Sequence, residues 1–370
     1  MKKISKLLAL VLALVMALAL VSCGGVTVGG ETGGNSTAST GDASTSAPED
    51  ASTGDASTSA PVDASGAQEG CNIDLTGVDL SGYNIGYVTI TSTAPWGGRV
   101  GTELQRMAEE AGATVKSLDA NTVADDVTNF CRQMIDSGVD ALAVFGGDPT
   151  AMVDIAKECD AAGIPLFLCA LDVAEEGREY ATACIGPDQE QMCYDIAQYM
   201  IEDFGADAGI NVVQISGVPF LMDYQLREAG FARAMEETNY NVYEPDYAYS
   251  SRPDAKTFME QHIQADGDAI DAVMGYDDDL TMGAVSAIQE AGLGDQIKVY
   301  SLTGQNDAIQ AVADGQMELT VMNRADDIAA ETCVAMYEYF TTGETEYYHY
   351  TPLTYITSEN VDEFIGKGEF

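Results

Sequence analysis

The sequence predicts an α/β protein made of two similar Rossmann-like lobes, each built on a parallel sheet. Two observations support this fold class. From residue 83 onward, short β-rich runs alternate with segments of helical period, as in parallel sheets covered by helices. The two halves of this region also repeat each other, because 139–164 and 270–293 both contain a strand, an acidic turn, an amphipathic helix and an Ala-Gly stop.

The β-rich runs give the order of the expected strands. In the first half they are 84–90, 114–118, 140–145, 164–170 and 180–186, and in the second half they are 210–216, 240–246, 271–276, 297–302 and 319–323. Gly163 and Gly292 follow the two repeated helical segments. We expect each of them to end its helix, since glycine adopts the left-handed conformation common after a helix.

The first 70 residues are predicted to lie outside this fold. Residues 1–22 combine three lysines with an apolar run, which is typical of a secretory signal peptide. "LVSC", ending at Cys23, resembles the processing box of bacterial lipoproteins, in which the cysteine is acylated. Residues 23–70 are rich in Ser, Thr, Gly, Ala, Asp and Pro and contain a 13-residue repeat, so we expect a disordered tether behind a lipid anchor.

Charge and cysteine content exclude several classes of protein. With 16 basic and 60 acidic residues the formal net charge is −44, which is the wrong sign for binding nucleic acid. Seven cysteines besides Cys23 include no CxxC pair, and their odd number argues against a complete disulfide framework. Cys169 and Cys184 lie in apolar runs and are expected to be buried free thiols, while partial pairing of the cysteines stays open.

The sequence favours a binding protein over an enzyme, with no catalytic residue, metal or cofactor expected. The two histidines, His262 and His349, do not follow predicted strands, and neither a GxSxG nor a Walker motif is present. A calcium loop beginning at Asp277 lacks glycine at its sixth position and glutamate at its twelfth.

Three consecutive carboxylates, Asp277, Asp278 and Asp279, stand where a strand meets the repeated helix of the second half. Ligands of open parallel sheets bind beyond the carboxyl ends of the strands, so Asp277 is expected to face a cleft. Asp279 is expected to cap the helix, and Asp278 could do either.

Other candidate ligand residues also follow predicted strands. The single tryptophan, Trp96, lies in "STAPWGG", and its ring suits the C–H face of a sugar, although a loop aromatic packed on its own lobe is the alternative. Asp223 and Arg227 are four residues apart on one helical face, as a cleft pair or as a surface ion pair.

From about residue 83 to 357 the chain resembles the sugar-binding periplasmic-type proteins of bacterial ABC importers, the group of the ribose- and galactose-binding proteins. The matching motifs occur in the family's order: "STAPWGG", "AAGIPLFLCALD", "DYQLREAGF", "GYDDDLTMGAVSAIQEAG" and "LTVMN". The resemblance implies the type I periplasmic binding protein fold, with a hinge of three segments between its lobes.

The resemblance also implies a set of ligand-binding residues. Trp96 matches the aromatic platform, Asp172 matches an acid that accepts ring hydroxyls, and Asp223 with Arg227 resembles the hexose-binding arrangement. Asn323 matches the family's amide, and Asp277 stands where the family usually has Asn. Thr93, in the first ligand loop, and Thr303, at a strand end, complete the set of expected ligand residues. The family's frequent aspartate is Thr303 here, and the arginine that often follows the Asp172 position is Val173.

The implied lobes are 83–186 plus 324–350 and 187–323 plus 351–370. The implied function is capture of a small sugar, expected to be a monosaccharide, by a monomeric extracytoplasmic protein that is anchored to the cell membrane through Cys23 alone. Permease subunits of an ABC importer would then be its partners. The alternatives are a binding protein that reports to a membrane receptor or kinase, and a binder of another small polar solute.

Overall fold

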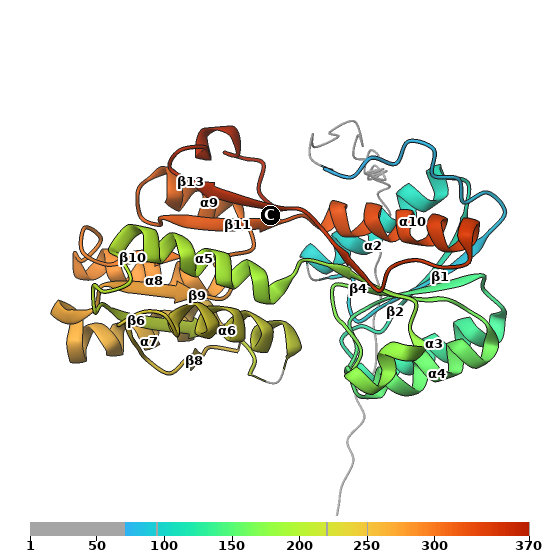
Figure 1. The fold of residues 1–370 in the computed structure, drawn as a ribbon, viewed down its shortest axis with the longest axis horizontal. Helices are drawn as coiled ribbons and strands as arrows, with labels where there is room; N and C mark the ends of the chain where they lie inside the picture. Colours follow the sequence, from blue (N-terminus) through green and yellow to red (C-terminus); the bar gives the residue numbers. More distant parts are fainter. Residues whose placement is uncertain (1–70, 94, 220, 250, 370) are drawn as a thin grey trace, which may run out of the picture. The chain divides into compact units, whose positions relative to one another are not determined.

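The computed structural model describes residues 71–93, 95–219, 221–249 and 251–369. The predicted signal peptide, lipidated Cys23 and tether lie outside these residues. The described chain forms two sheets with helices on both faces of each, as Figure 1 shows. The prediction of two parallel-sheet α/β halves is confirmed.

The first sheet has six strands, all paired in parallel, in the order β12-β5-β4-β3-β1-β2. Their bounds are β1 (Asn84–Thr89), β2 (Thr114–Asp119), β3 (Ala141–Phe145), β4 (Leu166–Cys169), β5 (Ala183–Gly186) and β12 (Tyr348–Tyr350). The helices of this half are α2 (Pro95–Glu110), α3 (Ala124–Ser137), α4 (Ala151–Ala162), the 3-10 helix η1 (Glu175–Tyr180) and α10 (Ala325–Thr342).

Alternate residues of each buried strand serve two separate cores. In β3, Ala141 and Ala143 pack with residues of α2 and α10, while Leu142 and Val144 pack with residues of α3 and α4. Successive side chains of a strand point to opposite faces, so a sheet covered on both sides needs the continuous apolar run found here.

The second sheet has the order β13-β11-β10-β9-β6-β7, and β8 also pairs with β6. Only β13 runs antiparallel to its neighbour among the strand pairs that the structure describes. The strand bounds are β6 (Asn211–Ser216), β7 (Asn241–Val242), β8 (Asp246–Tyr247), β9 (Ala272–Gly275), β10 (Lys298–Tyr300), β11 (Leu319–Asn323) and β13 (Leu353–Thr357).

Helices again cover both faces of this second sheet. One core contains residues of α5 (Gln189–Phe204) and α6 (Met222–Met235), and the other contains residues of α7, α8 and α9. The remaining bounds are α7 (Arg252–Asp266), η2 (Gly267–Ala269), α8 (Asp278–Ala291), α9 (Asn306–Ala313) and η3 (Val361–Glu363).

Three short connections carry the chain between the two sheets. They lie between β5 and α5, between β11 and α10, and between β12 and β13. The carboxyl ends of the parallel strands lead into these connections and into helix N-termini. The division into lobes that move as units stays a prediction.

Two details differ from the sequence predictions or refine them. The single strand expected over 240–246 is divided into β7 and β8, because Pro245 lies between them and cannot donate a hydrogen bond to a neighbouring strand. All seven cysteines of the described chain are free, which confirms free thiols at Cys169 and Cys184. Cys169 is buried as predicted, whereas Cys184 is only partly buried, because it lies on β5 close to a cavity. The partial pairing left open by the sequence is absent from this part of the chain.

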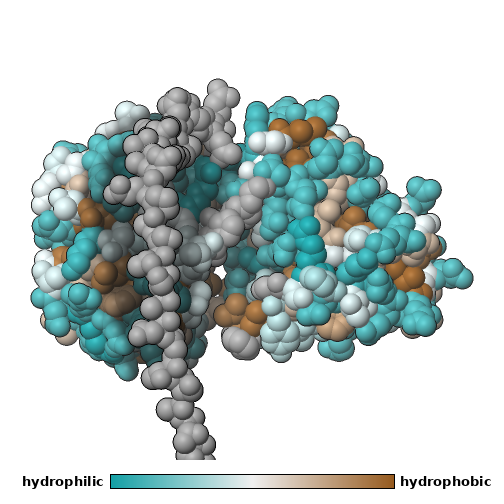
Figure 2. Space-filling model, turned by 180° about the vertical axis from the view of Figure 1, so that it is seen from behind, coloured by the Kyte–Doolittle hydropathy of each residue, from teal (hydrophilic) through white to brown (hydrophobic). Residues whose placement is uncertain are grey.

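The surface agrees with the strongly acidic composition. The face in Figure 2 is largely hydrophilic, and its hydrophobic residues form separate patches. Within the residues described above, no helix combines the length and the apolar character needed to cross a membrane.

The two repeated helices end as predicted. Gly163 follows α4 with φ 69°, and Gly292 follows α8 with φ 71°, so both occupy the left-handed region. Each backbone N–H is donated to carbonyls of the last helical turn, which closes the helix end.

Replacement of Gly292 by alanine should therefore destabilise the fold through backbone strain alone. A Cβ at Gly292 would meet no atom within 4 Å, and the left-handed conformation costs an L-residue about 1 to 2 kcal/mol. Gly267 provides a matched control, because it follows α7 with φ −51°. We expect urea denaturation to show a lower midpoint for Gly292→Ala and an unchanged or higher one for Gly267→Ala. Equal midpoints would contradict the strain argument.

Candidate functional site

A cavity of about 230 Å³ is lined by residues from both halves of the described chain. It contains residues from the first half at α2, β3 and the turn after β4, and residues from the second half at five separate elements or loops. Its lining residues are Trp96, Phe145, Ala170, Leu171, Gln189, Asp223, Tyr224, Arg227, Asp277, Thr303, Gln305 and Asn323. Most of these side chains follow the carboxyl end of a strand, where parallel α/β sheets bind ligands.

Six of the eight predicted ligand residues line this cavity, and two do not. Thr93 is exposed and its hydroxyl lies 2.9 Å from that of Thr91. Asp172 lies in a neighbouring cavity, and its carboxylate is already engaged. The roles of all eight residues in binding stay predictions.

Two aromatic rings form an apolar corner of the cavity. The ring centroids of Trp96 and Phe145 are 5.9 Å apart, with planes tilted by 54°. Gly97 permits this arrangement, because a Cβ at Gly97 would lie 2.5 Å from the Phe145 ring. The indole Nε1 of Trp96 donates to the backbone carbonyl of Asn323 at 3.1 Å, which fixes the orientation of the ring. Trp96 lies in the first turn of α2 and not in the expected loop. It packs beside Phe145 of its own half, donates to Asn323 of the other half, and lines the cavity.

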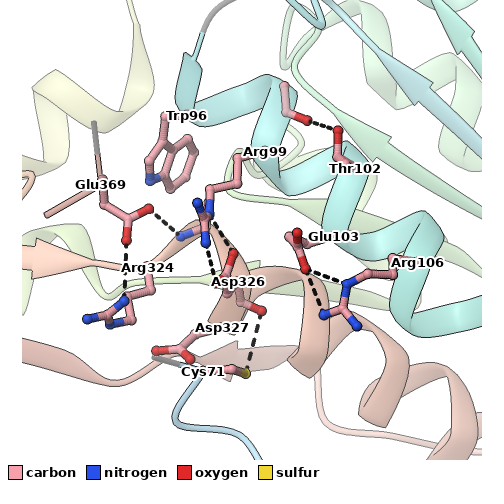
Figure 3. A network of polar contacts seen from close by, with 12 residues as sticks. Cys71, Trp96, Arg99, Thr102, Glu103, Arg106, Arg324, Asp326, Asp327 and Glu369 are labelled. Carbon is pink, nitrogen blue, oxygen red and sulfur yellow. Dashed lines mark hydrogen bonds and ion pairs between the residues drawn. The ribbon is translucent and has the colours of Figure 1, made fainter. Parts of the chain in front are cut away.

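A polar network holds the helix that carries Trp96. Arg99 in α2 donates through Nε and Nη2 to the two carboxylate oxygens of Asp326 in α10, both at 2.7 Å (Figure 3). The side chain of Glu369 accepts a hydrogen bond from the backbone N–H of Ala325 at 3.2 Å and lies 3.9 Å from Arg324. Two contacts therefore hold the start of α10, directly after the connection from β11: the pairing of Asp326 with Arg99 and the hydrogen bond from Ala325 to Glu369.

Arg227 is the one cation among the described residues that line the cavity, and it is buried. Its side chain is 6% exposed, its Nε donates to the Gln189 side chain at 2.8 Å, and its Nη1 donates to the carbonyl of Tyr276 at 2.9 Å. Its Nη2 lies 3.8 Å from Asp223, four residues earlier in α6. These contacts hold the guanidinium in place before any ligand binds, so the pair is not a surface ion pair.

Two acceptor atoms of the cavity have no hydrogen-bond partner within the described part of the chain. They are Oδ1 of Asp223 and Oδ1 of Asn323, and both are buried. A buried acceptor without a partner costs free energy, and nearly all such atoms in proteins are satisfied. Hydroxyl groups of a ligand would satisfy both atoms.

The three consecutive aspartates have three different environments. Asp277 caps α8, because its Oδ1 accepts the backbone N–H of Asp279 at 2.8 Å, and it also lines the cavity. Asp279 is partly exposed and pairs with Arg252 at 2.7 Å. The prediction that Asp279 caps the helix is therefore wrong, because the residue that keeps an extended backbone before the first helical turn is Asp277.

Asp278 is fully buried beneath the loop that carries Thr303. Its carboxylate accepts hydrogen bonds from the Thr320 hydroxyl and from the backbone N–H of Gln305, each at 2.9 Å. Its own backbone N–H donates to the Thr303 hydroxyl at 3.3 Å. Asp278 thus positions the loop and does not face the cavity.

Burial raises the pKa of both inner carboxyls. For Asp278 burial raises the pKa from 3.8 to about 7, against the opposing effect of hydrogen bonds from Ser301 and Gln305. For Asp277 the loss of solvent raises the pKa to about 6, and the positive charge of Arg227 opposes the shift. Asp277 is therefore poised to change charge in mildly acidic solution.

Backbone strain also marks this cavity. Ala170 and Thr303 have φ values of 69° and 118°, which non-glycine residues rarely adopt, and both residues line the cavity. Such strain persists only where surrounding contacts enforce it, and it concentrates at functional sites. Ala170 is held by its N–H bond to Ile185 at 2.7 Å and by the close backbone of Gly186.

Gln189 and Gln305 were not singled out by the sequence, because an amide at the start of a helix has no distinctive pattern. Phe145 did stand at a predicted strand end, which is a usable signal.

No group of three or more His, Cys, Asp or Glu side chains suited to a metal ion occurs in the region that the structure describes.

Comparison with known proteins places the chain in a family. Residues 85–345 match the periplasmic binding protein domain. The chain belongs to this periplasmic binding protein family. The resemblance inferred from the ordered motifs is thereby confirmed.

The sequence of this periplasmic binding protein is similar to those of two sugar-binding proteins from other bacteria. It is 26% identical over 242 residues to the galactofuranose-binding protein YtfQ of Escherichia coli K12, covering 64% of this chain and 76% of the relative. It is 25% identical over 244 residues to the ribose import binding protein RbsB of Bacillus subtilis 168, covering 66% and 77%.

Solved structures agree on the fold. A periplasmic ribose ABC transporter protein from Conexibacter woesei superposes with a TM-score of 0.72 at 20% identity, covering 80% of this chain and all of that one. A galactofuranose-binding protein superposes with a TM-score of 0.69 at 24% identity, covering 78% and 98%. The predicted type I periplasmic binding protein fold is confirmed.

The buried carboxyl of Asp278 gives this binding protein a distinctive pH dependence of stability. Its folded-state pKa of about 7 exceeds its ordinary value of 3.8, so between these values the folded chain holds a proton that the unfolded chain releases. The stabilising contribution is therefore largest at acidic pH and is lost as the pH rises through 7.

Asp278→Asn should remove this contribution, since the amide keeps an acceptor for Gln305 but does not titrate. We expect thermal unfolding between pH 5 and 8 to show that the variant gains stability relative to the wild type as the pH rises. Melting curves whose separation is the same at every pH would contradict the assignment.

Proposed function

We propose that this chain captures a small sugar in the cavity lined by Trp96 and Arg227 and delivers it to the permease of an ABC importer. The observation that carries the proposal is the convergence, in one cavity, of an aromatic corner, a pre-positioned arginine and two buried acceptors without partners. The sugar-binding proteins among its relatives support the same substrate class.

The cavity offers each part of a sugar a suitable surface. The apolar C–H face of a ring can stack in the corner formed by Trp96 and Phe145, where it replaces water on both sides. Its hydroxyls can donate to the carboxylates of Asp223 and Asp277 and to the amide oxygen of Asn323. Arg227 can donate to a ring oxygen or hydroxyl, and hydrogen bonds to charged groups are stronger than neutral ones.

Ligand contacts to both halves of the chain would couple binding to closure. Trp96 and Phe145 come from the first half, whereas Arg227 and Asp277 come from the second. A bound sugar contacts all of them at once only when the halves come together, so it favours the closed state. In this proposal the permease reads the closed state, and Cys23 anchors the protein to the membrane.

The proposed sugar binding can be tested by a thermal-shift screen followed by calorimetry. The screen uses pentoses, hexoses and inositols, with amino acids and nucleosides as other polar solutes. We expect a sugar to raise the melting temperature in a concentration-dependent manner. A shift with an amino acid or nucleoside, and with no sugar, would overturn the carbohydrate assignment.

Trp96→Ala should weaken binding of the sugar found in the screen by at least about tenfold, which corresponds to about 1.4 kcal/mol. Trp96→Phe keeps a stacking face but loses the hydrogen bond to Asn323, so its loss should be smaller. Calorimetry measures both affinities, and circular dichroism checks that each variant folds. Unchanged affinity in a folded Trp96→Ala variant would remove Trp96 from the site.

The affinity should also fall in mildly acidic solution. The carboxyl of Asp277 has a pKa of about 6, so it is largely ionised above pH 7 and largely protonated near pH 5. Protonation removes the charge that strengthens hydrogen bonds from sugar hydroxyls. We expect the dissociation constant to increase several-fold from pH 7.5 to pH 5, and Asp277→Asn to flatten this profile. An equally steep profile in the variant would assign the dependence to another group.

A further inference from the structure

A second cavity, of about 360 Å³, borders the first. The two cavities share four lining residues, namely Ala170, Leu171, Gln189 and Asp223. The second one extends toward β12 and toward the connection between β5 and α5, where Gly186 and Pro187 line it. The two cavities are therefore adjacent, and a molecule longer than one ring that is bound in the first would extend toward the second.

Two tyrosines of β12 form an aromatic wall of this second cavity. Tyr348 and Tyr350 are two residues apart, so their side chains lie on the same face of the strand. Their rings are stacked with centroids 5.5 Å apart and planes only 6° apart. The guanidinium of Arg178 lies 5.8 Å from the centre of the Tyr348 ring. Tyr350 is 57% exposed, which leaves much of its ring available.

Helix α6 contributes side chains to both cavities, from two adjacent rows on its surface. Asp223 and Arg227, four residues apart, line the first cavity, and Asp223 also borders the second. Met222 and Leu226, each one residue earlier, line the second. Residues four apart lie on one helical face, so the two rows run side by side along the helix. The first row is charged and the second is apolar, which gives the second cavity an apolar surface besides its tyrosines.

The charged residues of the second cavity argue against an anionic ligand. Its carboxylates are Asp172, Asp188, Glu190 and Asp223, and its guanidiniums are those of Arg178 and Arg233. Arg178 already pairs with Asp172 at 2.8 Å, and Arg233 pairs with Glu190. The excess of carboxylate repels phosphate and sulfate, whereas neutral hydroxyl groups can donate to carboxylates.

Asp172 is part of this wall and is held rigidly. Its Oδ1 accepts from the Tyr347 hydroxyl at 2.6 Å, and its Oδ2 accepts from the Tyr348 hydroxyl at 3.0 Å. Through these bonds the acid that the family resemblance assigns to ligand binding is tied to the tyrosine wall. The hydrogen bond from Tyr348 also restricts the position of the stacked rings.

We propose that the second cavity is a subsite for a second sugar ring, which makes disaccharides or glycosides substrates of this protein. The inference rests on the proposed sugar binding in the first cavity. One ring occupies the corner at Trp96, and the next ring stacks on Tyr350 with its hydroxyls toward the carboxylates. An aromatic stack with a neighbouring apolar row and excess carboxylate provides both surfaces that a neutral sugar ring needs.

The test is calorimetry of the full chain with matched monosaccharides and disaccharides. The probes are D-glucose with maltose, cellobiose and gentiobiose, D-galactose with lactose and melibiose, and D-xylose with xylobiose. We expect at least one disaccharide to bind ten times more tightly than its monosaccharide. Tyr350→Ala should abolish this gain and leave monosaccharide affinity within twofold, while Tyr350→Phe should keep the gain because it retains the ring.

Tyr249→Ala is the matched control, because Tyr249 is 61% exposed and lines neither cavity. It should change neither affinity. If monosaccharides bind but no disaccharide binds more tightly, or if Tyr350→Ala weakens both equally, the second subsite is overturned and the proposed function stands. If no saccharide of either length binds, the proposed function is overturned and the subsite with it.

Discussion

The short connection between β11 and α10 constrains the candidate site more than any other segment of the described chain. Asn323, the last residue of β11, lines the cavity with its side chain and accepts a hydrogen bond from the Trp96 indole through its backbone carbonyl. Two residues later, Ala325 donates its backbone N–H to Glu369 near the end of the chain. Asn323 thus adjoins a segment that passes from one sheet to the other. A ligand that contacts Asn323 would act on this segment directly, so no chain of intermediate residues is needed to couple binding to a movement of the two halves.

Three neighbouring carboxylates of this acidic chain lie in different surroundings, which limits the repulsion between them. Asp279 pairs with Arg252 in contact with solvent, Asp278 is buried under hydroxyl and backbone donors, and Asp277 lies between these extremes near Arg227. One strand-to-helix junction thereby supplies a surface ion pair, an internal support for the Thr303 loop and a polar group of the cavity. The cost of burying two carboxyls is reduced because their pKa values allow them to hold protons.

Much of the fold could be predicted from sequence because its causes are local. Continuous apolar runs indicate strands covered on both faces, and Gly163 and Gly292 mark helix ends through a conformation that glycine adopts easily. The repeat of strand, acidic turn and helix was enough to indicate two sheets. Strand ends also identified six of the lining residues, since the topology of parallel sheets decides where such residues gather.

The parts that sequence could not predict depend on contacts distant along the chain. Asp279 carries a good helix-capping side chain, yet Asp277 forms the cap because the chain leaves β9 one residue earlier than expected. Asp172 is engaged by Tyr347 and Tyr348, which are more than 170 residues away in sequence. Neither the pairing of β12 with β5 nor the packing of Arg178 on Tyr348 leaves a local pattern that could announce these contacts.

The position of Asp172 links the two cavities in a way that bears on substrate length. In the first half, the turn after β4 contributes Ala170 and Leu171 to both cavities, and Asp172 to the second alone. In the second half, α6 divides its rows in the same manner, with Asp223 shared and Leu226 on the side of the tyrosines. In each of these two elements, residues that line both cavities are followed within a few positions by a residue that lines only the second. A single ring would meet the shared boundary, whereas a longer saccharide would extend past it and contact Tyr350, close to the connection at Pro187.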